Sequence, residues 1–167
     1  MVVAQQDEIG ILTEQVDSLI NNAILGYYPH RQVLTLMKYT GARISDALSC
    51  EHWELDSNTG ISFYAQKNNT LVQLLLDELP TTIDEILNNA KVAAEQLKYE
   101  DTARYIKSYQ KYKISTSGTN DLRTHLFRYY FAKLKYSQGK SISAISAMIG
   151  DTAQRTIGYI SATITIN

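Results

Sequence analysis

Residues 125–132 read HLFRYYFA. They lie in a longer segment, residues 121–137, whose apolar residues predict one helix, and the turn residues at 138–140 (QGK) end it. His125 and Arg128 are three residues apart, so they share one face of this predicted helix. One imidazole and one guanidinium can therefore reach the same anionic group. A second interpretation stays open, in which Arg128 covers the flanking aromatic rings and His125 belongs to the core.

The chain on either side of this segment predicts a mainly helical domain. Helices are expected over residues 12–25, 31–39, 44–52, 83–97, 101–113, 121–137 and 143–149, with Thr13 as the N-cap of the first. Residues 61–65 and 71–75 are rich in β-branched, aromatic and aliphatic side chains and are separated by turn residues, which predicts a hairpin. The predicted fold class is therefore mainly α with a small antiparallel β-hairpin or meander (α+β).

The length and composition favour one globular domain. The 167 residues are 44% hydrophobic, which suits one core and leaves little room for a second. No run approaches the ~20 apolar residues of a membrane helix, and the N-terminus has no signal-peptide pattern. The single cysteine, Cys50, excludes an internal disulfide and a cysteine-rich zinc site. We therefore expect an intracellular protein, in the cytoplasm or nucleoid or virus-encoded within a host cell, without a membrane segment.

The charge is unevenly distributed along the chain. Residues 98–140, the basic segment, hold 10 Lys and Arg against 3 Asp and Glu, although the net charge of the whole chain is −1. Residues 1–97 hold 5 against 13. A basic segment in an acidic chain is the arrangement that a phosphate-binding face needs. Lysines on a solvated helix produce the same pattern, so charge alone leaves both interpretations open.

Two further motifs flank the hairpin and the HLFRYYFA helix. Residues 40–48 read TGARISDAL and present Arg43 on a turn just ahead of a helix. Residues 149–159 read IGDTAQRTIGY and end at Tyr159, and Lys67 lies on the hairpin turn. In this order, the motifs resemble the catalytic domain of the tyrosine recombinases, the phage-integrase family. The resemblance covers roughly residues 12–160 and implies the recombinase catalytic-domain fold.

The resemblance implies a reaction without metal or cofactor, in which Arg43 and Arg128 bind the non-bridging oxygens of a DNA phosphate. Two guanidiniums suit this task because they make bidentate, charge-assisted hydrogen bonds. Tyr159 attacks the phosphorus and forms a 3′-phosphotyrosine, His125 accepts the tyrosine proton, and Lys67 protonates the leaving 5′ oxygen. The partners implied are double-stranded DNA and further copies of the chain, as a tetramer on two duplexes. The process is recombination or integration of a mobile element.

Asp151 departs from the family pattern. The family has a histidine or tryptophan at this third-box position, donating a hydrogen bond to the phosphate. An ionised carboxylate accepts instead, and at ~4 Å it repels a phosphate charge by ~4 kcal/mol for an effective dielectric of ~20. Either the loop places Asp151 away from the phosphate, with Thr152 or Gln154 donating, or the domain binds DNA but cleaves slowly or not at all. The interval to Tyr159 is also one residue shorter than usual.

Several alternatives therefore remain. The chain is a recombinase, a recombinase-fold DNA-binding protein that has lost cleavage, or a topoisomerase-like nicking and resealing enzyme. We expect residues 1–167 to form one catalytic domain, without the N-terminal helical domain of most relatives, so the chain is a fragment or a minimal member. Taken singly, Arg43 could pair with Asp46, Lys67 could be an ordinary surface lysine, and Tyr159 is one of 12 tyrosines. If the family chemistry holds, the two arginines, His125 and Tyr159 should converge on one phosphate-sized space.

Overall fold

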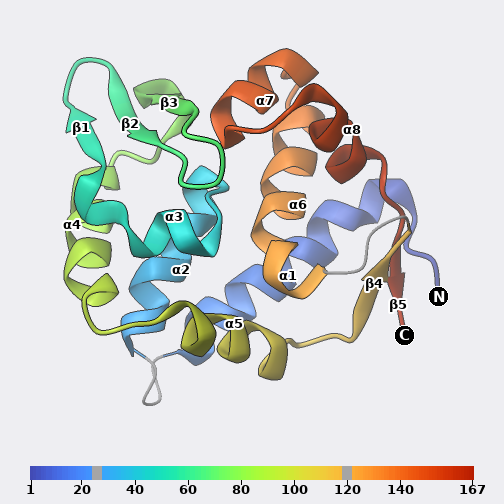
Figure 1. The fold of residues 1–167 in the computed structure, drawn as a ribbon. Coiled ribbons are helices and arrows are strands. Elements are labelled where there is room, and N and C mark those ends of the chain that lie inside the picture. The colour runs from blue at the N-terminus through green and yellow to red at the C-terminus, as the bar shows by residue number, and fades with distance from the viewer. Residues whose placement is uncertain (24–27, 118–121) are drawn as a thin grey trace.

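The computed structural model describes residues 1–23, 28–117 and 122–167, which form helices around two small antiparallel sheets (Figure 1). The helices are α1 (Gln5–Asn22), α2 (Tyr28–Thr40), α3 (Ile44–Leu48), α4 (Ile83–Ala94), α5 (Tyr99–Ser108), α6 (Leu122–Ser137), α7 (Ile142–Ile149) and α8 (Ala153–Ser161), with 3-10 turns η1 (Cys50–His52) and η2 (Leu76–Glu78). The strands are β1 (Glu54–Asp56), β2 (Gly60–Tyr64), β3 (Leu71–Leu75), β4 (Ile114–Thr116) and β5 (Ile164–Ile166). The predicted fold class, mainly α with a small antiparallel sheet, is confirmed.

Helix α6 is central to the packing. It contacts α1, α2, α5, α7 and α8, while α2 packs against α1 and α4 (Figure 1). Its buried residues include Phe127 and Phe131, which join Leu12 of α1 and Met37 of α2 in one hydrophobic core. A residue on α6 can therefore touch groups that lie far away in the sequence. Within the described part of the chain, no helix is both long and apolar enough to cross a membrane.

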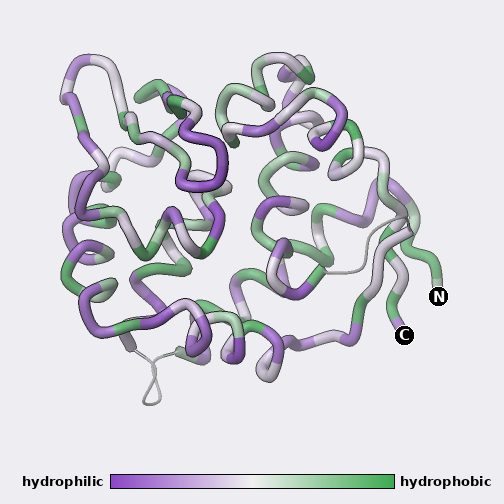
Figure 2. The backbone as a smooth tube through the Cα atoms, in the orientation of Figure 1, coloured by the Kyte–Doolittle hydropathy of each residue, from purple (hydrophilic) through white to green (hydrophobic). Residues whose placement is uncertain are grey.

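The predicted hairpin is part of a three-stranded antiparallel meander, β1-β2-β3. Val72 and Leu74 of β3 are buried while Leu71 and Leu75 are exposed, the alternation expected of a half-buried strand. The turn that joins β2 to β3, residues 65–70, points toward α7 (Figure 1) and is hydrophilic (Figure 2). The meander therefore brings a polar turn to the end of α7.

The starts of the first two helices differ from those predicted, whereas α3 and α4 begin at residues 44 and 83 as expected. Helix α1 begins at Gln5, and Thr13 lies inside it, donating its hydroxyl hydrogen to the Ile9 carbonyl (2.7 Å) rather than capping an N-terminus. Helix α2 begins at Tyr28 because Pro29 falls in its first turn, where the missing N–H leaves no bond unmade. The expected end of the first helix at residue 25 and the expected start of another at residue 121 lie outside the described residues.

The chain ends meet in a second sheet that the sequence did not predict. Strand β5 pairs with β4, and the Val3 amide donates to the Ile164 carbonyl (3.0 Å) (Figure 1). Both strands have three residues and come from distant parts of the chain, so no local periodicity marks them. This sheet fixes the segment that follows α8.

Candidate active site

The turn after α2 places Arg43. Gly41 has a left-handed φ of +68°, and its amide donates to the Met37 carbonyl (2.8 Å), which ends the helix. A Cβ at position 41 would lie 2.7 Å from the Phe131 ring, so the turn packs directly on α6. Only glycine satisfies both conditions. Arg43, the N-cap position of α3, is therefore held close to α6.

Arg128 is fully buried, and three segments hold it. Its Nη1 donates to the Gly41 carbonyl (2.9 Å), and its Nη2 donates to the Ile149 carbonyl (3.1 Å) and to Asp151 Oδ2 (3.1 Å). Its Nε donates to the Tyr159 hydroxyl at 3.4 Å. The alternative in which Arg128 extends its guanidinium into water is therefore wrong, because 1% of the residue is exposed.

Asp151 joins the two arginines. Helix α7 ends at Gly150 with a left-handed φ of +64°, and the Asp151 amide donates back to the Ser146 carbonyl (3.1 Å). This turn aims the carboxylate inward, where Oδ2 lies 3.1 Å from Nη2 of Arg43 and 3.1 Å from Nη2 of Arg128. The side chain is 3% exposed. The loop therefore places Asp151 against both arginines, since guanidiniums removed from water attract the nearest carboxylate. That it lies away from a bound phosphate stays a prediction.

The two alternative donors proposed from the sequence, Thr152 and Gln154, lie at the start of α8. Thr152 is the N-cap of α8, where its hydroxyl accepts from the Arg155 amide (3.2 Å), and the Thr152 amide donates to Asp151 Oδ1 (2.9 Å). Gln154 is exposed on the first turn of α8. The short α7–α8 loop therefore presents the Asp151 carboxylate to the arginines, and a donor role for Thr152 or Gln154 stays a prediction.

Tyr159 of α8 faces the same space. The Arg128 guanidinium carbon lies 5.5 Å from the centroid of the Tyr159 ring, and Tyr129 packs edge-on against that ring at 5.0 Å. The His125 ring lies 6.4 Å from it, tilted by 38°. Arg43 joins the group through the shared Asp151 oxygen. The four side chains that the sequence predicted to converge do so; their catalytic roles stay predictions.

Lys67 lies exposed on the β2–β3 turn, outside this converging group. The turn itself is tied to the site by two neighbours of Lys67. Asn68 Nδ2 donates to the Gly150 carbonyl (3.2 Å), and the Gln66 amide donates to Asp46 Oδ1 (2.8 Å). The sequence missed both contacts because polar residues in a turn are typical of any turn.

The arginine pair is electrostatically strained. Burial lowers the pKa of the Arg43 guanidinium, the positive charge of Arg128 lowers it further, and the carboxylates of Asp151 and Asp46 oppose both effects. Arg43 Nη1 is buried and finds no hydrogen-bond partner in the part of the chain that the structure describes, and Asp46 Oδ2 lies 3.8 Å away. Asp46 thus pairs with Arg43 and fixes the turn, as a positioning residue. Two guanidiniums beside a tyrosine hydroxyl can hold a tetrahedral anion next to a nucleophile.

No protein-family model matches the chain, and no curated protein matches it in sequence. Among solved structures, its fold is similar to the crystal structure of the XerH site-specific recombinase bound to difH substrate, a pre-cleavage complex, with a TM-score of 0.52 and 16% identity. The fold is tyrosine-recombinase-like. The similarity covers 92% of this chain and 48% of that one, so the chain spans about half the length of the recombinase it matches.

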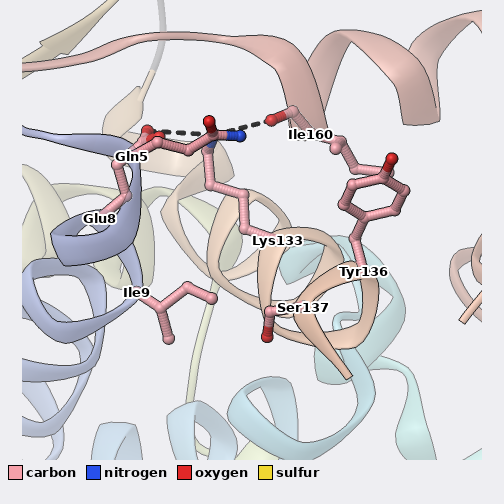
Figure 3. A pocket seen from close by; sticks show the side chains of 7 residues that line it. All are labelled: Gln5, Glu8, Ile9, Lys133, Tyr136, Ser137 and Ile160. Carbon is pink, nitrogen blue, oxygen red and sulfur yellow. Dashed lines mark hydrogen bonds and ion pairs between the residues drawn. The ribbon is translucent and has the colours of Figure 1, made fainter. Parts of the chain in front are cut away.

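The far end of the Tyr159 helix is held by a second buried cation of the recombinase-like fold. Lys133 of α6 donates to the carbonyls of Ile160 and Ala162 (both 2.8 Å), and its Nζ lies 3.1 Å from Glu8 Oε2 of α1 (Figure 3). A pocket opens beside it, lined by Gln5, Glu8, Ile9, Lys133, Tyr136, Ser137 and Ile160 (Figure 3). A cation at a helix C-terminus is stabilising. Lys133 therefore fixes the end of α8 immediately after Tyr159.

The basic segment is not one continuous phosphate-binding face. Arg128, Lys133 and Lys135 of α6 are buried, and each meets a carboxylate from another segment. Six other cations of the segment are exposed, namely Lys98, Arg104, Lys107, Lys111, Lys113 and Arg123. The basic segment therefore contains two sets of cations. The buried set stabilises the recombinase-like fold through ion pairs, and the other set is exposed to solvent.

Proposed function

We propose that the chain cuts and rejoins DNA strands in site-specific recombination or integration, through a covalent bond between Tyr159 and a DNA phosphate. The observation that carries this proposal is the convergence of Arg43, His125, Arg128 and Tyr159 around one buried anion site. These residues come from three motifs that are well separated in the sequence, and the packing on α6 brings them together. The recombinase-like fold supports the same assignment.

The chemistry assigns each side chain one step. The Arg43 and Arg128 guanidiniums bind the non-bridging oxygens and neutralise charge that grows as the phosphorus becomes five-coordinate. The Tyr159 oxygen forms a bond to phosphorus, the bond to the 5′ oxygen breaks, and His125 accepts the phenolic proton. Lys67 gives a proton to the leaving 5′ oxygen. Attack by a 5′ hydroxyl reverses these steps, so rejoining needs no further co-reactant.

The partner that this reaction requires is double-stranded DNA. Exposed cations of the basic segment, such as Lys107 on α5, are available to contact the DNA backbone. Exchange between two duplexes needs four nucleophiles, so the active assembly is a tetramer of chains on two duplexes. Residues 1–167 are the catalytic domain of that assembly.

Asp151 favours a second candidate function, a recombinase-fold protein that binds DNA without cutting it. Its carboxylate occupies both guanidiniums at 3.1 Å, which are the groups that cleavage would use. A permanently occupied arginine pair leaves DNA binding to the exposed cations. This candidate predicts salt-dependent binding to DNA and no covalent product.

Covalent capture on a nicked suicide duplex tests the proposal. The unsubstituted chain should form a protein–DNA adduct that resists denaturation, and Tyr159→Phe should abolish it. Tyr136→Phe is the matched control, because Tyr136 is an exposed tyrosine of α6 and should leave the adduct unchanged. DNA binding without any adduct would support the second candidate instead. Relaxation of supercoiled DNA lacking paired sites would identify a topoisomerase-like activity.

A further inference from the structure

We propose that Asp151 is a built-in competitor for the DNA phosphate. When DNA is absent, its carboxylate occupies the position between Arg43 and Arg128 that a phosphate oxygen would take. The carboxylate leaves this position when a phosphate binds. This inference rests on the proposed function, because it assigns the regulation of the same site. It differs from a loss of cleavage, since a competitor that can leave slows the reaction without preventing it.

The geometry of the shared oxygen is the first support. Asp151 Oδ2 accepts from Nη2 of Arg43 and from Nη2 of Arg128, both at 3.1 Å. The side chains of Asp151 and Arg128 are 3% and 2% exposed, and the Arg43 side chain is 11% exposed. A phosphate oxygen bound by both guanidiniums would need the same position. The carboxylate and a phosphate oxygen therefore exclude one another sterically as well as by charge.

An unused donor is the second support. Among the described residues, buried Arg43 Nη1 has no hydrogen-bond partner, and Asp46 Oδ2 lies 3.8 Å from it. A buried donor left unpaired costs free energy, so its presence needs a reason. A phosphate has several oxygens that can accept hydrogen bonds, whereas a single Asp151 oxygen accepts from both Arg43 and Arg128. The site is therefore built for a larger oxyanion than the one that fills it.

The loop that carries Asp151 is the third support. Asp151 lies between α7 and α8, on a short connection anchored at Gly150, whose carbonyl accepts from Asn68 Nδ2 (3.2 Å). The same β2–β3 turn carries Lys67. Movement of the carboxylate away from the arginines therefore involves the turn that bears the proposed general acid. Until then, Asp151 compensates two buried positive charges that would be costly alone.

A permanent positioning role for Asp151 is the competing account, and it predicts the opposite result. If the carboxylate orients the arginines while phosphate binds beside it, removing its charge should weaken phosphate binding. If the carboxylate competes, removing its charge should strengthen phosphate binding. Asp151→Asn keeps the shape and removes the charge, so it separates the two accounts.

Inorganic phosphate is the probe, measured by thermal unfolding of the full chain at constant ionic strength. Asp151→Asn should bind phosphate at least about tenfold more tightly than the unsubstituted chain, seen as a larger rise in melting temperature at each concentration. Adding Arg43→Gln to it should remove the gain. Glu78→Gln is the matched control, because Glu78 also contacts two cations, Lys135 and Lys140, and it should gain nothing. Equal or weaker binding by Asp151→Asn, or an equal gain by Glu78→Gln, would overturn the proposal.

Two further experiments distinguish failure of this inference from failure of the proposed function. On a suicide duplex, Asp151→Asn should form the Tyr159 adduct faster than the unsubstituted chain, and a slower rate would overturn the competitor role. If no variant forms an adduct, the proposed cleavage fails, while the phosphate titration still decides whether Asp151 competes. If Asp151→Asn does not fold, the Thr152 amide resonance of the unsubstituted chain replaces it as the reporter. That amide donates to Asp151 Oδ1 and should shift on saturation with phosphate; an unmoved resonance contradicts displacement.

Discussion

Two carboxylates of this chain each meet two cations, but they do so in different ways. Glu78 gives each lysine its own oxygen, with Oε2 2.8 Å from Lys135 and Oε1 2.5 Å from Lys140. Asp151 gives one oxygen, Oδ2, to both Arg43 and Arg128. In each case one of the cations, Lys135 or Arg128, belongs to α6. The same helix therefore contributes cations to two charge clusters. The clusters differ in how many of their donors and acceptors are paired.

The difference separates a structural cluster from a functional one. Around Glu78 each oxygen has a partner, and Lys140 reaches the surface with 40% of its side chain exposed. Around Asp151 a donor of Arg43 stays unpaired, and the hydroxyl of Tyr159 lies 3.4 Å from the Nε of Arg128. Buried polar groups are almost always paired in folded proteins, and the exceptions gather at functional sites. The unpaired Arg43 donor therefore supports the proposed chemistry at the Asp151 cluster, while Glu8 Oε2 and Gln110 Nε2 are buried without a hydrogen-bond partner elsewhere in the described residues.

The largest expected loss of stability distinguishes Arg128 from Lys135, the two cations that α6 contributes to these clusters. Arg128→Gln removes a group that binds two carbonyls and Asp151, and leaves that carboxylate partly unpaired, so we expect a loss of about 3–5 kcal/mol of unfolding free energy. Lys135→Gln should cost about 1–2 kcal/mol, because Glu78 keeps Lys140. Urea unfolding at neutral pH measures both. Equal losses would show that the two clusters are equivalent.

The next largest effect on stability concerns the Gly41 turn, which holds Arg43 close to α6. Gly41→Ala introduces a Cβ 2.7 Å from the Phe131 ring at a φ of +68°, and should destabilise the fold by about 2–3 kcal/mol. Gly10→Ala is the control, because a Cβ there meets nothing within 4 Å and Gly10 lies inside α1. It should stabilise the fold by about 0.5–1 kcal/mol. Denaturant midpoints compare the two, and a neutral Gly41→Ala would contradict the role of the turn.

A smaller effect concerns pH and the lysine cluster. Hydrogen bonds from Lys135 and Lys140 lower the pKa of Glu78 in the folded state, despite partial burial. Its stabilisation is therefore complete above the unfolded pKa of ~4.3 and is lost as the pH falls through the lower folded value. Glu78→Gln should cost about 1–2 kcal/mol at pH 7 and progressively less below pH ~4. A difference between the two chains that stays constant down to pH ~2 would contradict this assignment.

Substitution of Lys67 should have the smallest effect on stability but a large effect on the rate of adduct formation. Lys67 is exposed, so Lys67→Ala should change the unfolding free energy by less than about 0.5 kcal/mol. If Lys67 protonates the leaving oxygen, adduct formation should fall by about 100-fold or more. A substrate with sulfur at the 5′ bridging position needs no such proton and should restore the rate. Unchanged adduct formation by Lys67→Ala would remove this residue from the mechanism.

Local features of the site could be predicted from the sequence. The helix around Arg128, its shared face with His125, and the turns at Gly41 and Gly150 follow from helical periodicity and from glycine's access to left-handed φ. Each of these depends on residues close together in the chain. Their spatial convergence rested on the family resemblance, and only the three-dimensional packing places them together.

Long-range pairings could not be predicted. Asp151 meets Arg43 across 108 positions, because α7 and the Gly41 turn ahead of α3 are both packed on α6. Lys133 and Lys135 looked like surface residues of a basic segment, and their burial depends on carboxylates supplied by Glu8 and Glu78 from elsewhere. Sequence periodicity reports which face of a helix is apolar. It does not report where a distant carboxylate will lie.

The central claim is that Tyr159 forms the bond to DNA, and mass spectrometry of the trapped adduct tests it most directly. Trypsin cleaves after Arg155, so Tyr159 lies in the C-terminal peptide, residues 156–167, which contains no other tyrosine. After nuclease digestion, the account predicts that this peptide carries the residual nucleotide on Tyr159. A nucleotide on any other peptide, or an adduct that survives in Tyr159→Phe, would contradict it.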